Sequence, residues 1–174
     1  RKNLKKSLGK RCKNMKSISP LFFVLIFLFI ASCNHSSLQK PYEFSNGWKN
    51  GEVVKFDFKA SDSKINQDLF LILRHNKNYQ FSNIFLITEL QFENDSIKKD
   101  TLEYRLSANS GKWLGEQKLS IVEHRLPFKM NLELQKDSLY TLLVRNSMRL
   151  NNEISPIQNL ENVLDLGLLM ESAK

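Results

Sequence analysis

The segment LFLILRHNKNYQFSNIFLITELQF, residues 69–92, contains two apolar runs separated by a polar loop. Leu69–Leu73 is apolar at every position, which is typical of a strand that is buried on both faces at the centre of a sheet. In Asn83–Phe92 one face carries Ile84, Leu86, Leu90 and Phe92, whereas the other changes from apolar residues to Glu89 and Gln91. We therefore predict a central strand, followed by a second strand that leaves the centre of the sheet.

Apolar residues alternate with polar ones in most of the remaining chain, and these runs predict strands at residues 54–58, 102–106, 126–134, 139–145 and 163–170. Met130 is in phase with Phe128, Leu132 and Leu134, so we expect it on the buried face. About eight short strands, with turn signals roughly every ten residues, predict an all-β fold, a jelly-roll-like antiparallel β-sandwich.

Two features near the C-terminus depart from plain alternation. Ser155-Pro156-Ile157-Gln158 has the order of a helix capping box, which predicts one short C-terminal helical turn. Gly167 interrupts the last apolar run, which indicates a β-bulge or a close approach of the backbone.

The N-terminal region has the pattern of a secretory signal. Eight Lys or Arg residues precede the ten apolar residues Leu21–Ile30, which are too few to span a bilayer as a helix. Ile30-Ala31-Ser32-Cys33 resembles a bacterial lipobox, so we expect cleavage before Cys33 and a lipid on its thiol. An ordinary secretory signal followed by a coincidental cysteine is the alternative.

These signals divide the chain into three parts. We predict an N-terminal extension and signal peptide over 1–32, with Met15 as the suspected start, a lipidated tether over 33–41 and a single β-sandwich domain over 42–174. The eight basic residues of the leader account for the whole excess of positive charge, since the other 18 basic residues equal the 18 acidic ones. The net charge of the chain after the leader therefore gives no general electrostatic reason to expect nucleic-acid binding.

Motifs that would indicate catalysis or metal binding are weak. His35, His75 and His124 lie far apart in the sequence, and no G-x-S-x-G motif is present. The carboxylates of Glu89, Glu93, Asp100 and Glu103 could form a glycosidase pair, although charges on the wet face of a strand are commoner. We expect no catalytic residues, no metal and no cofactor.

Aromatic residues in the polar connections are the candidate binding residues: Trp48, Tyr79, Phe81 and Trp113. They could form a protein-binding surface or a carbohydrate site, or Trp48 and Trp113 could plug the open ends of the sandwich. Within 76–82, alternation places Tyr79 and Phe81 on one side of the loop, which we expect to face a partner. The competing expectation is that both rings pack inward.

Several segments resemble the GldH family of gliding-motility lipoproteins. The resemblance rests on Asn46-Gly47-Trp48, residues 69–89, Asp100–Tyr104, Gly111–Gly115 and Asp165-Leu166-Gly167-Leu168. It covers nearly all of the chain after Cys33. Gln80 and Arg105 stand where the family pattern has Pro, and Ala108-Asn109-Ser110 replaces a turn that contains Asp-Pro.

The resemblance implies a non-enzymatic lipoprotein that supports assembly or stability of the gliding and type IX secretion machinery, with other envelope proteins as partners. A carbohydrate-binding lipoprotein of the outer membrane is the alternative. Asn34 after the lipidated cysteine favours the outer membrane, and the lack of an acidic run there favours its periplasmic face. Three segments also resemble O-glycosylation acceptors: Asp95-Ser96-Ile97, Asp100-Thr101-Leu102 and Asp137-Ser138-Leu139.

Overall fold

The computed structural model describes residues 36–60, 66–94, 96–135 and 137–173. These residues belong to one compact unit, Asn34–Lys174, which is separate from Arg1–Cys33. The predicted leader and Cys33 lie outside the described residues. In the part of the chain that the structure describes, no helix has the length and apolar character needed to cross a membrane.

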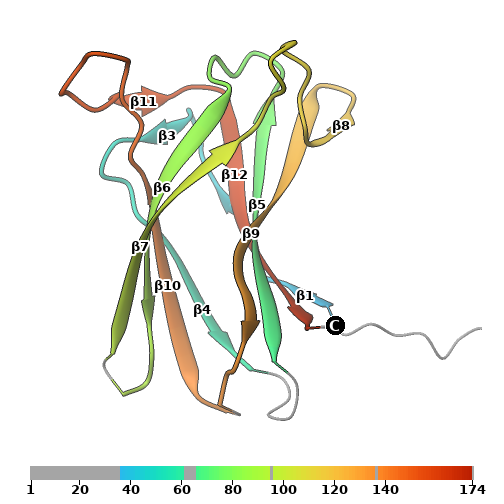
Figure 1. Ribbon diagram of the computed structural model, residues 1–174, viewed down its shortest axis with the longest axis vertical. Helices are drawn as coiled ribbons and strands as arrows, with labels where there is room; N and C mark the ends of the chain where they lie inside the picture. The colour runs from blue at the N-terminus through green and yellow to red at the C-terminus, as the bar shows by residue number, and fades with distance from the viewer. Residues whose placement is uncertain (1–35, 61–65, 95, 136, 174) are drawn as a thin grey trace, which may run out of the picture. The chain divides into compact units, whose positions relative to one another are not determined.

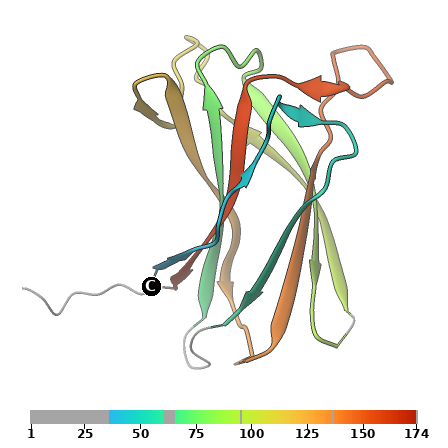
Figure 2. The ribbon, with the colours of Figure 1, turned by 180° about the vertical axis from the view of Figure 1, so that it is seen from behind.

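The described residues form strands that pair antiparallel into two larger sheets and one short pair (Figures 1 and 2). The strands are β1 (Ser36–Leu38), β2 (Tyr42–Glu43), β3 (Trp48–Lys49), β4 (Val54–Lys59), β5 (Gln67–Asn76), β6 (Asn83–Gln91), β7 (Ile97–Arg105), β8 (Glu116–Lys118), β9 (Ile121–Leu132), β10 (Leu139–Asn146), β11 (Asn159–Leu160) and β12 (Val163–Ser172). The first sheet has the order β1-β12-β5-β9-β8, with β2 also on β12, and the second has the order β4-β10-β6-β7. Strands β3 and β11 pair with each other.

The apolar periodicity of the sequence explains why the two sheets face each other. Strand β5 is buried along most of its length and lies between β12 and β9, so the predicted central strand is confirmed. Strand β6 alternates between buried and half-buried residues, with Ile84, Leu86 and Leu90 fully buried. The inner faces of both sheets share one apolar core, and the all-β, sandwich-like fold class is confirmed.

Bulges in β9 explain why Met130 is 52% exposed, although the sequence predicted it on the buried face. Opposite β5, the register of β9 shifts twice, on either side of the Leu69–Lys129 pair. Each extra residue moves the following side chains to the other face of the sheet, so the sequence alternation no longer reports burial there.

The predicted helical turn at Ser155–Gln158 is wrong. Pro156 forms an antiparallel bridge with Arg149, and the N–H of Ile157 donates to the carbonyl oxygen of Met148 at 2.9 Å. A single helical turn fixes several dihedral angles for one hydrogen bond, so pairing across this loop prevails over the capping signal.

Two further local predictions need correction. Gly167 pairs in regular register with Ile72, and the bulge in β12 lies between Val163 and Asp165 instead. A Cβ atom at Gly167 would make only ordinary contacts, the nearest at 3.6 Å, so no close approach requires glycine there. Part of the predicted tether is also structured, because Ser36–Leu38 pairs with β12.

Candidate functional site

One end of the sandwich, which we call the loop end, holds the connections that carry the candidate aromatic residues. The strand directions bring together residues 77–82, residues 106–115, the β8–β9 hairpin and the segment 147–162, as the top of Figure 1 shows. Backbone hydrogen bonds join these loops, since Leu106 donates to the oxygen of Ser82 at 2.7 Å and Asn76 to that of Asn162 at 2.9 Å.

Trp48 is fully buried at the loop end. Its ring stacks on Phe44 with centroids 4.9 Å apart, and its indole N–H donates to the carbonyl oxygen of Glu52 at 3.0 Å. A buried Trp whose N–H has a partner is a stable part of the core. Trp48 therefore exposes no surface to which a partner could bind. Its position fits the alternative prediction that it fills an open end of the sandwich.

Tyr79 also points inward, so the prediction that it faces a partner is wrong. It is only 4% exposed, and its hydroxyl donates to the carbonyl oxygen of Asn83 at 3.2 Å. Burial raises the pKa of the phenol well above its usual range. The Phe81 ring packs edge-on against it at 5.6 Å but stays half-exposed, so Tyr79 is enclosed in the core whereas Phe81 keeps an accessible side.

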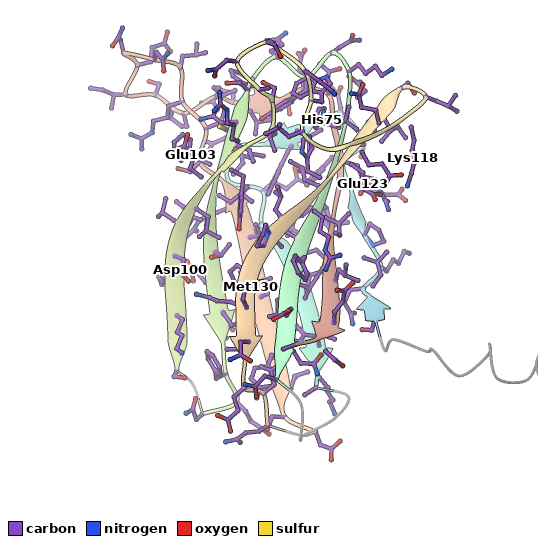
Figure 3. The ribbon with its side chains drawn as sticks, turned by 45° about the vertical axis from the view of Figure 1, so that its right-hand side comes forward. His75, Asp100, Glu103, Lys118, Glu123 and Met130 are labelled. Carbon is purple, nitrogen blue, oxygen red and sulfur yellow. The ribbon has the colours of Figure 1, made fainter. Side chains whose placement is uncertain are left out.

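The structure reveals a histidine pair that the sequence analysis missed. His75 at the end of β5 and His124 in β9 are 0% and 4% exposed, and their Nε2 atoms are 3.0 Å apart. Strands β5 and β9 are neighbours, with Leu73 opposite His124 and His75 opposite Val122, so the two imidazoles meet on a diagonal. Figure 3 shows His75 at this end of the sandwich.

Hydrogen bonding assigns the protons of the pair. Nδ1 of His75 lies 2.7 Å from the carbonyl oxygen of Asn76, which can only accept, so Nδ1 carries the hydrogen. Nε2 of neutral His75 is then an acceptor, and Nε2–H of His124 donates to it. Protonating His75 would place two N–H groups face to face unless His124 changed tautomer.

Aromatic rings cover the pair. Trp113 contacts His75 edge-on at 4.5 Å, and Tyr79 lies 5.0 Å from the same imidazole. We call His75, Tyr79, Trp113 and His124 the loop-end cluster. Gly115 packs closely against it, because a Cβ atom there would clash with the backbone oxygen of Glu123 and with Nδ1 of His124.

Burial makes the charged form of both histidines unfavourable. Desolvation lowers the pKa of His75, although its bond to the Asn76 carbonyl opposes this shift. Desolvation, together with the nearby His75, lowers the pKa of His124 to about 4. Both imidazoles are therefore neutral at neutral pH, and the pair works as a structural hydrogen bond that acid would disrupt.

Three of the four carboxylates singled out in the sequence are engaged elsewhere. Glu89 pairs with Arg145 at 2.6 Å, Asp100 with Lys129 at 2.7 Å, and Glu103 accepts from Asn83 at 2.7 Å. Among the described residues, no group of three or more His, Cys, Asp or Glu side chains could hold a metal ion.

Two of the possible glycosylation acceptors, Ser96 and Thr101, are exposed, and Ser138 is half-buried. Asp95, which precedes the first of them, lies outside the described residues. Modification at these positions stays a prediction.

Phe81 and Trp113 remain half-exposed, and Phe81 lines a groove. Two adjoining cavities of about 280 and 250 Å³ share Gln80, Phe81 and Leu150 as lining residues. We call them together the Phe81 groove. Of the four predicted aromatic binding residues, Phe81 is therefore the one that the structure places in an accessible concave site.

Comparisons with known proteins match this chain to one protein family. The family model described as GldH lipoprotein matches residues 37–170. A gliding motility lipoprotein GldH homolog of Christiangramia forsetii is 31% identical over 90% of this chain and 97% of its own length. The gliding motility lipoprotein GldH of Flavobacterium johnsoniae is 30% identical over the same shares of the two chains.

Solved structures show only distant similarity. The structure of the infectious bursal disease virus Gx strain aligns with 80% of this chain and 33% of that chain, at 8% identity and a TM-score of 0.35. A family GH115 glucuronidase gives a TM-score of 0.34 at 13% identity, over 80% of this chain and 17% of that chain. At these scores, neither comparison informs function.

Proposed function

The chain belongs to the GldH lipoprotein family, and on this premise we propose that it is an accessory envelope protein that supports assembly or stability of the gliding and type IX secretion machinery without catalysing a reaction. The observation that carries the proposal is the extent of the match. Residues 37–170 run from β1 to β12, so the similarity involves both sheets and every connection of the loop end. A shared scaffold together with its shared loops supports a shared role.

We further propose that a lipid on Cys33 anchors the protein to the outer membrane at its periplasmic face. Only Asn34 and His35 separate Cys33 from β1, which pairs with β12. Since a chain extends by at most about 3.5 Å per residue, such an anchor would hold the sandwich within roughly 10 Å of the lipid surface. The protein would then meet partners beside the membrane and would not reach across the periplasm.

Deleting the gene in the source bacterium tests the proposed role. We expect loss of colony spreading and reduced export by the type IX route, both restored by the wild-type chain. Abundance of the other gliding and secretion proteins should be measured in the same strains, because a failure of assembly lowers it. Normal spreading and normal export in the deletion strain would contradict the proposal.

The Cys33→Ala variant tests the anchor separately. It should take up no fatty-acid analogue in metabolic labelling, should keep its leader and should fail to restore spreading. Ser32→Ala retains a small residue before Cys33 and serves as the matched control. Labelling of the Cys33→Ala protein would contradict the lipobox interpretation.

A further inference from the structure

The Phe81 groove is elongated. Its first cavity is lined by Gln80, Phe81, Leu150, Ile157, Asn159 and Glu161, and its second extends past the shared residues to Asn83, Phe85, Arg149 and Asn151. Each cavity alone is somewhat smaller than a typical small-molecule site of about 300 to 1,000 Å³. A ligand that fills the groove must therefore extend through both cavities.

The aromatic rings of the groove are accessible on one side. Phe81 and Phe85 are half-buried, and both side chains pack against the hydrophobic core. The Phe81 ring also contacts Tyr79. Rings that are fixed in position can receive the flat C–H face of a ligand without losing side-chain freedom on binding.

Neutral amides surround these rings. Gln80 and Asn151 are exposed, and Asn83 and Asn159 are half-exposed. Gln80 and Asn151 can each offer both a donor and an acceptor, which is what vicinal hydroxyl and acetamido groups need, whereas Asn83 already donates to Glu103 and Asn159 to the carbonyl oxygen of Asn46. Arg149 and Glu161 are the charged side chains that line the two cavities, and their charges are opposite. The lining therefore favours an uncharged polar ligand.

Aliphatic side chains add a third element. Leu150, which is 48% exposed, lies between the two cavities, and Ile157 lines the first one. They provide small apolar surfaces next to the amides, which suits the methyl group of an acetamido substituent. A long apolar peptide fits less well, because exposed amides and charges would be desolvated along most of its length.

A cavity at the opposite end of the sandwich has different chemistry. It has a volume of about 360 Å³ and is lined by Phe92, Glu93, Asn94, Glu133, Gln135, Ser138 and Tyr140. Among the described residues that line it, the two charged side chains are both carboxylates and none is aliphatic. The combination of aromatic, amide and aliphatic groups with balanced charge therefore distinguishes the Phe81 groove from this cavity.

We propose that the Phe81 groove is a binding site for an uncharged oligosaccharide that contains N-acetylated hexosamine units. Successive sugar rings lie over Phe81 and Phe85, their hydroxyl and amide groups bond to Gln80, Asn83 and Asn151, and an acetyl methyl group contacts Leu150. This inference goes beyond the proposed role in gliding, and it can hold or fail independently of that role.

Calorimetric titration of the purified full-length lipoprotein in detergent tests the proposal. The probes are chitohexaose, which carries acetamido groups, cellohexaose, which lacks them, and an apolar hexapeptide. We expect chitohexaose to bind at least about tenfold more tightly than cellohexaose, since the latter leaves amides and aliphatic groups of the groove without partners.

Two variants locate the site. Gln80→Ala removes an exposed amide shared by both cavities, and Phe81→Leu removes the shared ring while keeping an apolar side chain. Each should weaken chitohexaose binding roughly tenfold. Ile154→Ala is the matched control, because Ile154 is 89% exposed in the same segment 147–162 but does not line the groove, and this variant should bind as the wild type does.

Several outcomes would overturn the proposal. The proposed sugar site would be wrong if chitohexaose did not bind, or if the wild type and Gln80→Ala bound it equally tightly. If cellohexaose bound as tightly as chitohexaose, the groove would have no preference for acetamido groups. If only the hexapeptide bound, the groove would be a protein-docking surface. Because Phe81→Leu could unfold, thermal melts accompany each variant, and Gln80→Ala, at an exposed position, carries the test in that case.

Discussion

The middle of the sandwich and its loop end are both well buried, but they are built from different side chains. In the middle, Leu71 and Leu86 are fully buried among other aliphatic residues of the core. At the loop end, the buried residues include His75, His124 and Tyr79, whose polar atoms have specific partners. The same sandwich therefore contains an aliphatic core in its middle and a hydrogen-bonded, aromatic core at its loop end.

This difference has an energetic consequence. The aliphatic middle depends on burial of apolar area, which does not change with pH. The loop-end cluster depends on neutral imidazoles and on hydrogen bonds that few alternative side chains can replace. We therefore expect the middle to determine overall stability and the loop end to determine how stability responds to acid.

Truncation in the middle should have the largest effect. Leu71→Ala and Leu86→Ala each remove buried methyl groups from a fully enclosed position, and each should lower the free energy of unfolding by about 2 to 5 kcal/mol. Denaturant titrations at pH 7.5 and pH 5.5 would measure the loss. It should be the same at both pH values.

Leu119→Ala is the matched control for these truncations, because Leu119 is 96% exposed at the β8–β9 turn. Its stability should change by less than about 0.5 kcal/mol. If both core variants lost less than about 1 kcal/mol, the assignment of β5 and β6 to the core would be wrong.

The contrast between the two regions also explains what the sequence could predict. Apolar alternation located β5 and β6, because burial on one or two faces leaves a periodic pattern within a single strand. The histidine pair depends on the register between β5 and β9, which are about 50 residues apart in the chain, and no local pattern encodes that register. His75 and His124 do share the inward phase of Leu73 and Leu126, a signal that suggests burial but not contact.

The aromatic loop illustrates a second limit. Alternation of Tyr79 and Phe81 showed that the rings share a side, but it could not show whether that side faces solvent. The answer depends on the loop 106–115, which brings Trp113 over His75. Likewise, the bulges of β9 that expose Met130 depend on pairing with β5 and leave no mark in the alternation itself.

Protonation of the histidine pair in acid should have the second-largest effect on the free energy of unfolding. Histidine has a pKa of about 6.5 in the unfolded chain, whereas burial lowers the pKa of His124 to about 4 in the folded protein. Below pH 6.5 the unfolded state therefore binds more protons, and stability falls until the pH reaches about 4. The shift of His124 corresponds to a total loss of roughly 3 kcal/mol.

Unfolding free energies measured from pH 7.5 to pH 5 would reveal this slope. Burial also raises the carboxyl pKa of Asp165, which acts in the opposite direction as the pH falls and is present in the wild type and in every histidine variant. The double variant His75→Gln, His124→Gln keeps polar groups that can bond to each other and should flatten the slope. An unchanged slope in that variant would show that the pair is not responsible.

Loss of the Tyr79 hydroxyl should have the smallest effect and would separate ring packing from hydrogen bonding in the loop-end cluster. Tyr79→Phe retains the ring against His75 and Phe81 but removes the bond to the carbonyl oxygen of Asn83, so it should cost about 1 kcal/mol. Tyr79→Ala also removes the ring and should cost about 3 to 5 kcal/mol, as for other buried aromatic residues.

Because burial raises the phenol pKa far above neutrality, the hydroxyl does not ionise between pH 5 and 7.5, and the loss in Tyr79→Phe should be constant across that range. Equal stability of Tyr79→Ala and wild type in thermal melts would place this ring outside the core and restore an exposed role for the loop.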